Sequence, residues 1–223
     1  MLVMVRHLPP SVRRSRWGHT VRAAGFLIVG LLLAGGMCVR SSPPGTETDD
    51  HARYHDRTFR VARVIDGDTL DLAVPDGRHS TTRVRLWGVD APEVGHDGAP
   101  SMYFGGEAVA FARRTLEGRT VRIVLVPRRT RGKYGRLLAY VYLEPDGRMF
   151  NEMLLEQGYA YADYRFPHPY ADRFKRLERQ ARKADVGLWR NVTLDKMPSW
   201  RRRWERRHAG RGRNRRRDSV TVP

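Results

Sequence analysis

The sequence predicts an α+β domain of five strands and three helices within residues 58–190. Segments in which apolar and polar residues alternate indicate half-buried strands. Segments with apolar residues at helical spacing, some of them followed by glycine, indicate helices. No internal repeat is present, and a hydrophobic share of 40% in 223 residues is enough for one modest core.

The predicted strands and helices follow one another without a long structureless loop. Residues 59–65 and 69–74 form two strands joined at Asp66-Gly67-Asp68. In the third strand, residues 83–89, the apolar Val84 and Leu86 share one face. Arg83, Arg85 and Trp87 lie on the other, so Arg85 is expected to point away from the apolar side. The remaining strands are expected at 121–126 and 137–143, and the helices at 107–116, 151–157 and 170–184.

Residues 1–40 are typical of an export signal. Five arginines precede an uncharged run at residues 23–39, and Ala34-Gly-Gly36 offers small residues for cleavage. The run is at the lower limit for spanning a bilayer, so an uncleaved membrane anchor is the alternative. Cys38 also resembles the lipid-attachment site of bacterial lipoproteins, although Met37 stands where that pattern has a small residue. We therefore expect a secreted or cell-envelope protein.

The segments that flank the predicted domain are polar. Residues 41–57 are poor in large apolar residues, which predicts a linker. Residues 191–223 carry eleven Lys and Arg against three Asp and Glu, and mix arginine with tryptophan. This composition predicts a disordered tail, and it also suits contact with nucleic acid or with anionic envelope components. The net charge of +18 favours polyanionic partners. Cys38 is the only cysteine, so no disulfide can form within the chain.

Carboxylates occur where two of the predicted strands end or turn. Asp68 follows the first strand and Asp90 ends the third, so both can face outward from the sheet. With a backbone carbonyl such as that of Ala91, and with water, they would make an oxygen site for a hard cation. The alternative is that both are ordinary turn sequences. Pro92 restricts the segment from Asp90 to Glu93 and so limits where Glu93 can lie.

One carboxylate and two arginines complete a set of side chains suited to cleaving a phosphodiester. Glu93 is the candidate general base that takes a proton from attacking water. Arg85 and Arg136 are candidate clamps, because a guanidinium binds two phosphate oxygens and stabilises added negative charge. Taken singly, each of these residues is equally interpreted as solvated surface.

Five ordered motifs resemble the staphylococcal nuclease family. They span roughly residues 58–190 and comprise Ile65-Asp-Gly-Asp-Thr69, Arg85-Leu-Trp-Gly-Val-Asp-Ala-Pro-Glu93, Tyr134-Gly-Arg-Leu-Leu-Ala-Tyr140, Asn151 through Gly158, and Gly187-Leu-Trp189. The resemblance implies a five-stranded oligonucleotide-binding (OB-fold) barrel with three helices. It implies a calcium-dependent nuclease of low sequence specificity on DNA and RNA, leaving 3′-phosphate and 5′-hydroxyl ends. Single-stranded or locally unpaired substrate and a monomeric protein are expected.

The resemblance also assigns roles by position. Asp68, Asp90 and the carbonyl of Ala91 are implied as calcium ligands, and Arg85, Glu93 and Arg136 as the catalytic groups. Lys133 and Tyr134 match positions near a terminal phosphate, and Tyr164 and Phe166 match an aromatic pair that packs against the nucleotide. Tyr159, Tyr161 and Tyr164 are alternatively interpreted as packing under the last helix.

One departure concerns the loop that carries Arg136. Gly132 stands where the family often has aspartate, so this loop is expected to be less firmly anchored.

Three hypotheses about function follow from the sequence. The first is an exported metal-dependent nuclease, and the second is a binding module of the same fold, catalytically weak or inactive and tethered to the envelope. The third is an envelope-anchored structural protein, with membrane association through residues 23–39 and the basic tail.

Overall fold

The structure, a computed structural model, describes residues 47–95, 98–126 and 129–218. The predicted export segment and the first residues of the predicted linker therefore lie outside the described residues. Within those ranges, none of the helices combines the length and apolar character needed to cross a membrane.

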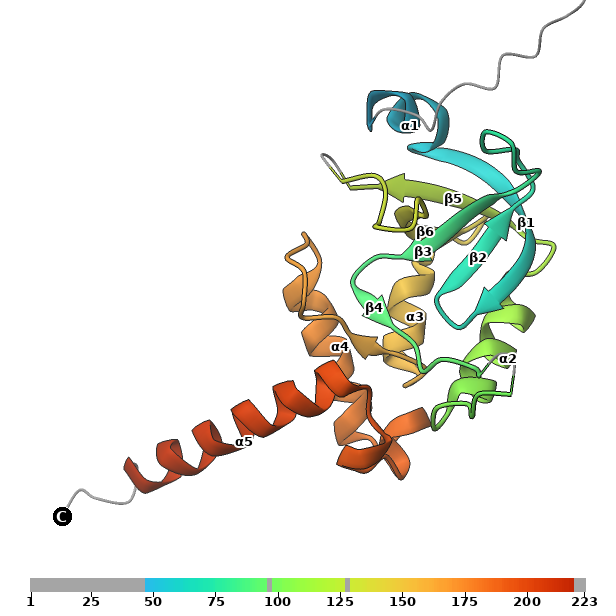
Figure 1. Cartoon of the computed structure of the whole chain (residues 1–223). Helices are drawn as coiled ribbons and strands as arrows, with labels where there is room; N and C mark the ends of the chain where they lie inside the picture. The colour runs from blue at the N-terminus through green and yellow to red at the C-terminus, as the bar shows by residue number, and fades with distance from the viewer. Residues whose placement is uncertain (1–46, 96–97, 127–128, 219–223) are drawn as a thin grey trace, which may run out of the picture. The chain divides into compact units, whose positions relative to one another are not determined.

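Five strands close into a barrel in the order β1-β2-β3-β6-β5 (Figure 1). All neighbours in the barrel are antiparallel except β3 and β6, which run parallel. Closure leaves no free sheet edge among these strands. The predicted α+β class, with a five-stranded barrel and accompanying helices, is thus confirmed. The barrel strands are β1 (Arg57–Asp66), β2 (Thr69–Leu72), β3 (Thr82–Leu86), β5 (Thr120–Leu125) and β6 (Leu137–Leu143).

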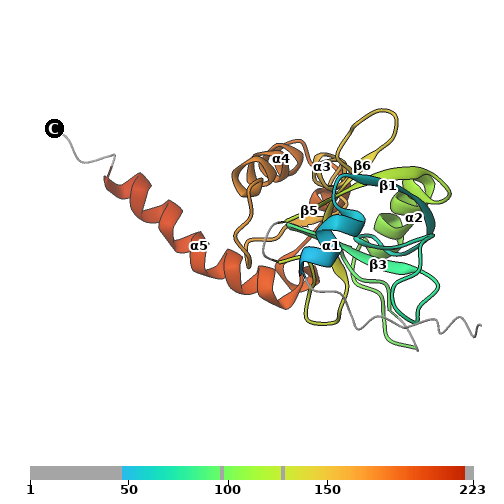
Figure 2. The ribbon, with the colours of Figure 1, turned by 90° about the horizontal axis from the view of Figure 1, so that it is seen from above.

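Helices cover the barrel from several sides. α1 lies over one end of the barrel, and α2 packs against β1 toward the opposite end (Figures 1 and 2). α3 packs on β6 and in turn against α4. The helices are α1 (Glu47–Tyr54), α2 (Gly105–Leu116), α3 (Phe150–Glu156), α4 (Ala171–Lys183) and α5 (Ser199–Asp218), with short 3-10 helices η1 (Gly187–Arg190) and η2 (Leu194–Lys196).

A buried asparagine joins α3 to the barrel. Asn151 is fully buried, and its amide nitrogen donates a hydrogen bond of 3.0 Å to the carbonyl of Trp87. Its amide oxygen accepts a hydrogen bond of 3.0 Å from the backbone N–H of Val141. Buried backbone groups cost free energy when unpaired. Asn151 therefore fixes the chain just after β3, where the candidate site begins.

The third predicted strand is shorter than expected. Residues 83–89 were predicted as one strand, but β3 ends at Leu86 and a separate strand β4 (Val89–Asp90) pairs with β7 (Tyr161–Ala162). Gly88 breaks the run because its φ is +78°, a left-handed conformation that favours glycine. Trp87, expected on the exposed face, is buried with 7% exposure. The chain turn thus carries Asp90 away from the barrel and onto β7.

Two predictions about the flanking segments are wrong in part. Residues 47–57, assigned to a linker, form α1 and the start of β1, and Tyr54 of α1 is fully buried. In the predicted disordered tail, residues 199–218 form α5, whose Trp200 and Arg201 are buried. Both helices were missed because these segments are polar overall. A few buried side chains are nevertheless enough to fix each helix to the domain.

Candidate active site beside the β1–β2 turn

The β1–β2 turn brings Asp68 against β4. Asp66 pairs with Thr69 across the turn, and Gly67 lies so close to Ala91 that a Cβ at Gly67 would be 2.7 Å from the Ala91 Cβ. Glycine at this position permits that approach. As a result the backbone N–H of Ala91 donates a hydrogen bond of 2.7 Å to Asp68 Oδ2.

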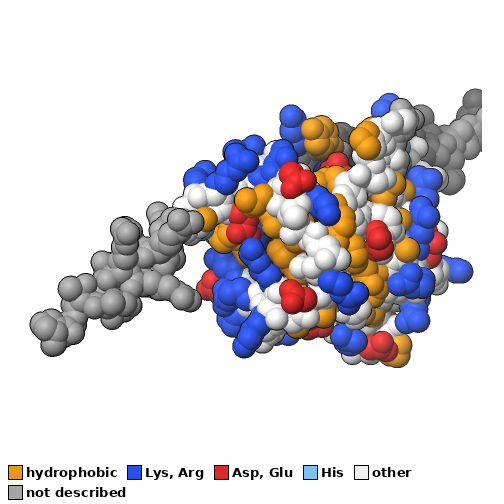
Figure 3. All heavy atoms as spheres, turned by 90° about the horizontal axis from the view of Figure 1, so that it is seen from below, with side chains coloured by type: hydrophobic (Ala, Val, Ile, Leu, Met, Phe, Trp, Pro, Cys, Tyr) orange, Lys and Arg blue, Asp and Glu red, His pale blue; other side chains and the backbone are white. Residues whose placement is uncertain are grey.

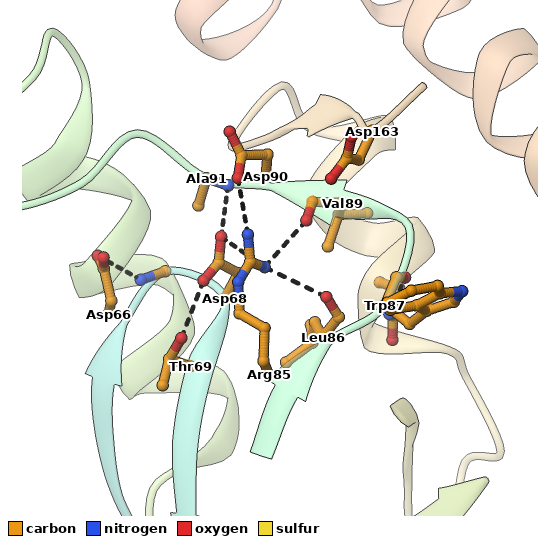
Figure 4. A network of polar contacts seen from close by, with 12 residues as sticks. Asp66, Asp68, Thr69, Arg85, Leu86, Trp87, Val89, Asp90, Ala91 and Asp163 are labelled. Atoms are coloured by element: carbon orange, nitrogen blue, oxygen red, sulfur yellow. Dashed lines mark hydrogen bonds and ion pairs between the residues drawn. The ribbon is translucent and has the colours of Figure 1, made fainter. Parts of the chain in front are cut away.

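Arg85 joins the two aspartates predicted to bind a cation. Its Nη1 lies 2.8 Å from Asp68 Oδ2, and its Nη2 lies 2.7 Å from Asp90 Oδ1 (Figure 4). The Nη1 group also donates a hydrogen bond of 2.9 Å to the carbonyl of Val89. Arg85 was expected to point away from the apolar side of its strand, and in the structure its side chain is only 15% exposed. The structure therefore brings Arg85, Asp68, Asp90 and Ala91 into one network, whereas the sequence placed them only at the turn after the first strand and in the segment of residues 85–91.

The electrostatics of the site indicate a shortage of positive charge. Asp68 is 5% exposed. Its pKa is raised to about 7, chiefly by burial and also by the carboxylates of Asp90 and Asp66, against the opposing effect of Arg85. Burial also raises the pKa of Asp66, to which Glu93 adds. The guanidiniums of Arg85 and Arg165 do not balance the carboxylates of Asp66, Asp68, Asp90 and Asp163, so an added cation would be stabilised here.

The donor chemistry fits a hard divalent cation. Carboxylate oxygens from Asp68 and Asp90 are the ligand type that such cations prefer. Within the described ranges, no three His, Cys, Asp or Glu side chains form a group that could hold a metal ion. Two carboxylates would therefore need backbone carbonyl oxygen and water to complete the coordination, as proposed for Ala91.

Glu93 and Arg136 lie outside this network. Glu93 is exposed, and its backbone carbonyl accepts a hydrogen bond of 2.9 Å from the N–H of Met102. Arg136 directly precedes β6, whose Leu137 pairs with Val84 of β3. In the described part of the chain, neither the Glu93 carboxylate nor the Arg136 guanidinium has an ion-pair partner. Both side chains are consequently available to a substrate.

The loop that carries Arg136 is anchored by its neighbour Arg131. The guanidinium of Arg131 forms ion pairs of 2.7 Å with Asp50 of α1 and with Asp76. It also donates a hydrogen bond of 2.8 Å to the carbonyl of Gly135. Gly132 was expected to leave this loop less firmly anchored than aspartate would, and in the structure Arg131 supplies contacts that anchor it.

The predicted substrate-binding residues fall into two groups. Tyr134 is 75% exposed, with Lys133 Nζ 5.4 Å and Arg136 Cζ 5.6 Å from its ring centroid. Phe166 is 39% exposed and stacks on Trp87 at 5.6 Å between ring centroids. These side chains are accessible to a ligand.

Tyr164 belongs to the second group, because it packs within the protein. Its hydroxyl donates a hydrogen bond of 2.9 Å to Glu178, and its ring centroid lies 4.8 Å from that of Trp204. Tyr159 stacks on Phe111 at 4.3 Å, and Tyr161 is 1% exposed. The packing interpretation of these three tyrosines is favoured.

Sequence reasoning missed two residues of the network. Arg165 Nη2 lies 3.0 Å from Asp90 Oδ1 and 2.8 Å from Asp163 Oδ2. The indole nitrogen of Trp200 donates a hydrogen bond of 2.7 Å to Asp90 Oδ2. Both residues were visible only as members of basic or aromatic segments, and no local pattern linked them to Asp90.

The surface charge suits a polyanionic ligand. On the face drawn in Figure 3, Lys and Arg side chains gather along the edges, with acidic side chains scattered among them. Such a distribution attracts nucleic acid without selecting a sequence.

Comparison with known proteins gives a consistent result. The family model described as staphylococcal nuclease homologue matches residues 83–191. A thermonuclease of Staphylococcus hyicus is 37% identical over 138 residues, covering 61% of this chain and 78% of the relative. A thermonuclease of Staphylococcus intermedius is 36% identical over 133 residues, covering 59% and 76%. An uncharacterized protein of Methanocaldococcus jannaschii is 33% identical over 162 residues, covering 63% and 74%. By its sequence and its barrel, the chain belongs to the family of staphylococcal nuclease homologues.

Proposed function

We propose that this protein is a calcium-dependent nuclease that hydrolyses phosphodiester bonds in DNA and RNA with low sequence specificity. The observation that carries the proposal is the joining of Arg85 to Asp68 and Asp90 at 2.8 and 2.7 Å, in a chain with thermonucleases among its relatives. A guanidinium can donate hydrogen bonds to a phosphate, and the two carboxylates beside it can bind a cation.

Asp68, Asp90 and the carbonyl of Ala91 are the groups that would hold calcium. When bound, the ion would supply Lewis-acid polarisation of a phosphate oxygen. Arg85 is already bonded to both carboxylates, so it must exchange at least one of these partners to contact a phosphate.

Two arginines and a glutamate would then act on the phosphate. Arg85 and Arg136 bind phosphate oxygens and stabilise the charge added as water attacks phosphorus. Glu93 accepts the proton of that water. The bond from phosphorus to the 5′-oxygen breaks, and the 5′-oxygen takes up a proton, leaving a 3′-phosphate and a 5′-hydroxyl.

Digestion of single-stranded DNA tests this assignment. Wild type, Glu93→Gln and Arg136→Ala are compared in calcium, in magnesium and in chelator. Each substitution is expected to lower the cleavage rate by on the order of 10²-fold or more. Glu156→Gln and Arg78→Ala serve as matched controls and should cleave like wild type, because Glu156 is exposed and pairs with Arg148, and Arg78 is exposed. Calcium-independent cleavage, or full activity of Glu93→Gln, would overturn the mechanism.

A second candidate is a nucleic-acid-binding protein of this fold without catalysis. The observation that favours it is that Arg85 is occupied by Asp68 and Asp90 and is thus withheld from a phosphate. Tight binding of single-stranded DNA without cleavage in any metal would support this candidate over the nuclease.

We also propose export, on the basis of the arginines and the uncharged run in residues 1–40. N-terminal sequencing of protein recovered from cells and medium distinguishes a cleaved signal from a retained anchor. A product beginning at Met1 in the soluble cell fraction would contradict export.

A further inference from the structure

The first turns of α5 lie against the candidate site although they follow the matched family region. α5 begins at Ser199, and the N–H of Arg202 donates a hydrogen bond of 2.9 Å to the carbonyl of Pro198. Trp200 is 9% exposed and packs in a small core with Met197, Tyr161 and Trp189. Apolar burial of this kind stabilises the folded state. The helix start is therefore held by the protein interior.

A buried arginine fixes the same turns to α4. Arg201 is 1% exposed, and its Nη1 donates a hydrogen bond of 2.9 Å to Glu178 of α4. Glu178 also accepts a hydrogen bond of 2.6 Å from the N–H of Ala162 in β7. Because β7 pairs with β4, in the register Asp90 to Tyr161, α5 is connected to the strand that carries Asp90.

Trp200 contacts the Asp90 carboxylate directly. Its Nε1 donates to Asp90 Oδ2 at 2.7 Å, while Asp90 Oδ1 accepts from Arg85 at 2.7 Å and from Arg165 at 3.0 Å. The Arg165 guanidinium also lies 4.5 Å from the Trp200 ring centroid. Both oxygens of the carboxylate are thus oriented, one by two cations and the other by a neutral indole.

The Trp200 indole is an uncharged donor, and this determines how it affects the Asp90 carboxylate. A carboxylate oxygen has two lone pairs, and an indole N–H occupies one of them without cancelling the negative charge. An arginine at the same place would compete with a metal ion for that charge. Oδ2 of Asp90 therefore keeps a lone pair and a fixed direction. Donors that hold a ligating carboxylate in this way generally raise metal affinity.

We infer that Trp200 is a positioning residue for the Asp90 carboxylate, through which the C-terminal helix α5 sets the calcium affinity of the site. The inference rests on the proposed calcium dependence. It assigns a role to a segment that composition alone marks as a basic tail.

The test is calcium titration by calorimetry without nucleic acid. Trp200→Phe keeps a ring for packing and for Arg165 but removes the N–H donor. Its calcium affinity is expected to fall by about 10- to 100-fold with little change in melting temperature. Trp204→Phe, one turn further along α5 and packed on Tyr164, is the matched control and should bind calcium like wild type. Equal affinity of Trp200→Phe and wild type would overturn the inference.

A second measurement examines the contact in calcium-free protein. In ¹⁵N-labelled samples, the Trp200 indole resonance is identified by its loss in Trp200→Phe. Asp90→Asn should shift this resonance, because the indole then donates to a neutral amide or loses its acceptor. An unshifted resonance would overturn the positioning role alone. Failure of wild type to bind calcium would instead overturn the proposed function and the inference with it.

Discussion

Arg201 of α5 and Glu178 of α4 form an ion pair inside the protein, with side-chain exposures of 1% and 3%. Glu205 of α5 lies 2.9 Å from the same guanidinium, and the ring of Trp204 lies 4.8 Å from its Cζ atom. Removing one partner of a buried pair leaves the other charge without compensation.

Arg201→Met should therefore destabilise the protein strongly. We expect the free energy of unfolding to fall by about 3–5 kcal/mol, because Glu178 would remain buried without its cation. Urea denaturation followed by fluorescence measures the change. Arg203→Met, at an exposed position of the same helix, is the control and should change stability by less than about 0.5 kcal/mol. Similar stability of both variants would mean that α5 is not docked on α4.

Asp71 should make stability fall at acid pH. Burial alone would raise its pKa, but hydrogen bonds from Arg83 and Arg63 outweigh burial and lower the pKa below its ordinary value of 3.8. The unfolded state thus binds the proton more readily, so the stability from Asp71 is present above about pH 4 and is lost as pH falls through the depressed pKa. Melting temperatures from pH 7 to pH 2 should converge for wild type and Asp71→Asn. A constant difference would contradict the assignment.

In calcium-free protein, Asp68 should change the pH dependence of stability in the opposite direction to Asp71. Its pKa is raised to about 7, chiefly by burial, so the folded state holds the proton more tightly than the unfolded state. The resulting stability is complete below the unfolded pKa of about 4 and is lost as pH rises through about 7. With chelator present, wild type should lose stability between pH 5 and pH 8 more steeply than Asp68→Asn. Parallel pH profiles would show that Asp68 is ionised throughout.

The exposed arginines of α5 should contribute to the salt dependence of nucleic-acid binding. Replacing Arg203, Arg206 and Arg207 by Gln should lower the slope of log affinity against log salt by up to about 2 on single strands, since each neutralised phosphate contributes about 0.7. Cleavage of bound substrate should be unaffected. The triple variant Arg113, Arg114 and Arg119 to Gln removes the same charge elsewhere. Equal slopes in the two triple variants would assign the effect to net charge rather than to α5.

Substitution is preferable to truncation for this question. Deleting the chain after Asn191 would remove Trp200 and Arg201 together with the basic side chains, and would leave Glu178 unpaired in the interior. If the truncated protein cleaved more slowly, the experiment would not show which of these losses caused the change.

The barrel strands could be predicted from the sequence because their signal is local. In β3, for example, buried Val84 and Leu86 alternate with Arg83 and Arg85, and this period is visible in five residues. Asp68 and Asp90 could also be placed near each other, because each lies at a strand end or turn. The ion pairs that Arg85 makes with both required the structure, since side-chain direction at a strand end depends on the following turn.

The contribution of α5 could not be predicted in the same way. Trp200 and Asp90 are 110 residues apart, and nothing in either segment identifies the other as its partner. Arg201 is buried while Arg203 is exposed, although both belong to one run of arginines. Burial of a charged residue depends on an acceptor supplied from elsewhere in the chain, here Glu178. The composition of the arginine-rich segment does not identify that acceptor.

The ion pair between Asp50 and Arg131 has a consequence for dissecting this protein. A fragment begun at residue 58, where the alternating strand pattern starts, would contain all the barrel strands except the first residue of β1, together with the proposed catalytic residues. It would lack Asp50, which is 2% exposed and holds Arg131 at 2.7 Å. The segment bearing Arg136 would then lose its tether to α1. We therefore expect that a fragment which keeps this tether, and with it the proposed catalytic geometry, must begin before Asp50.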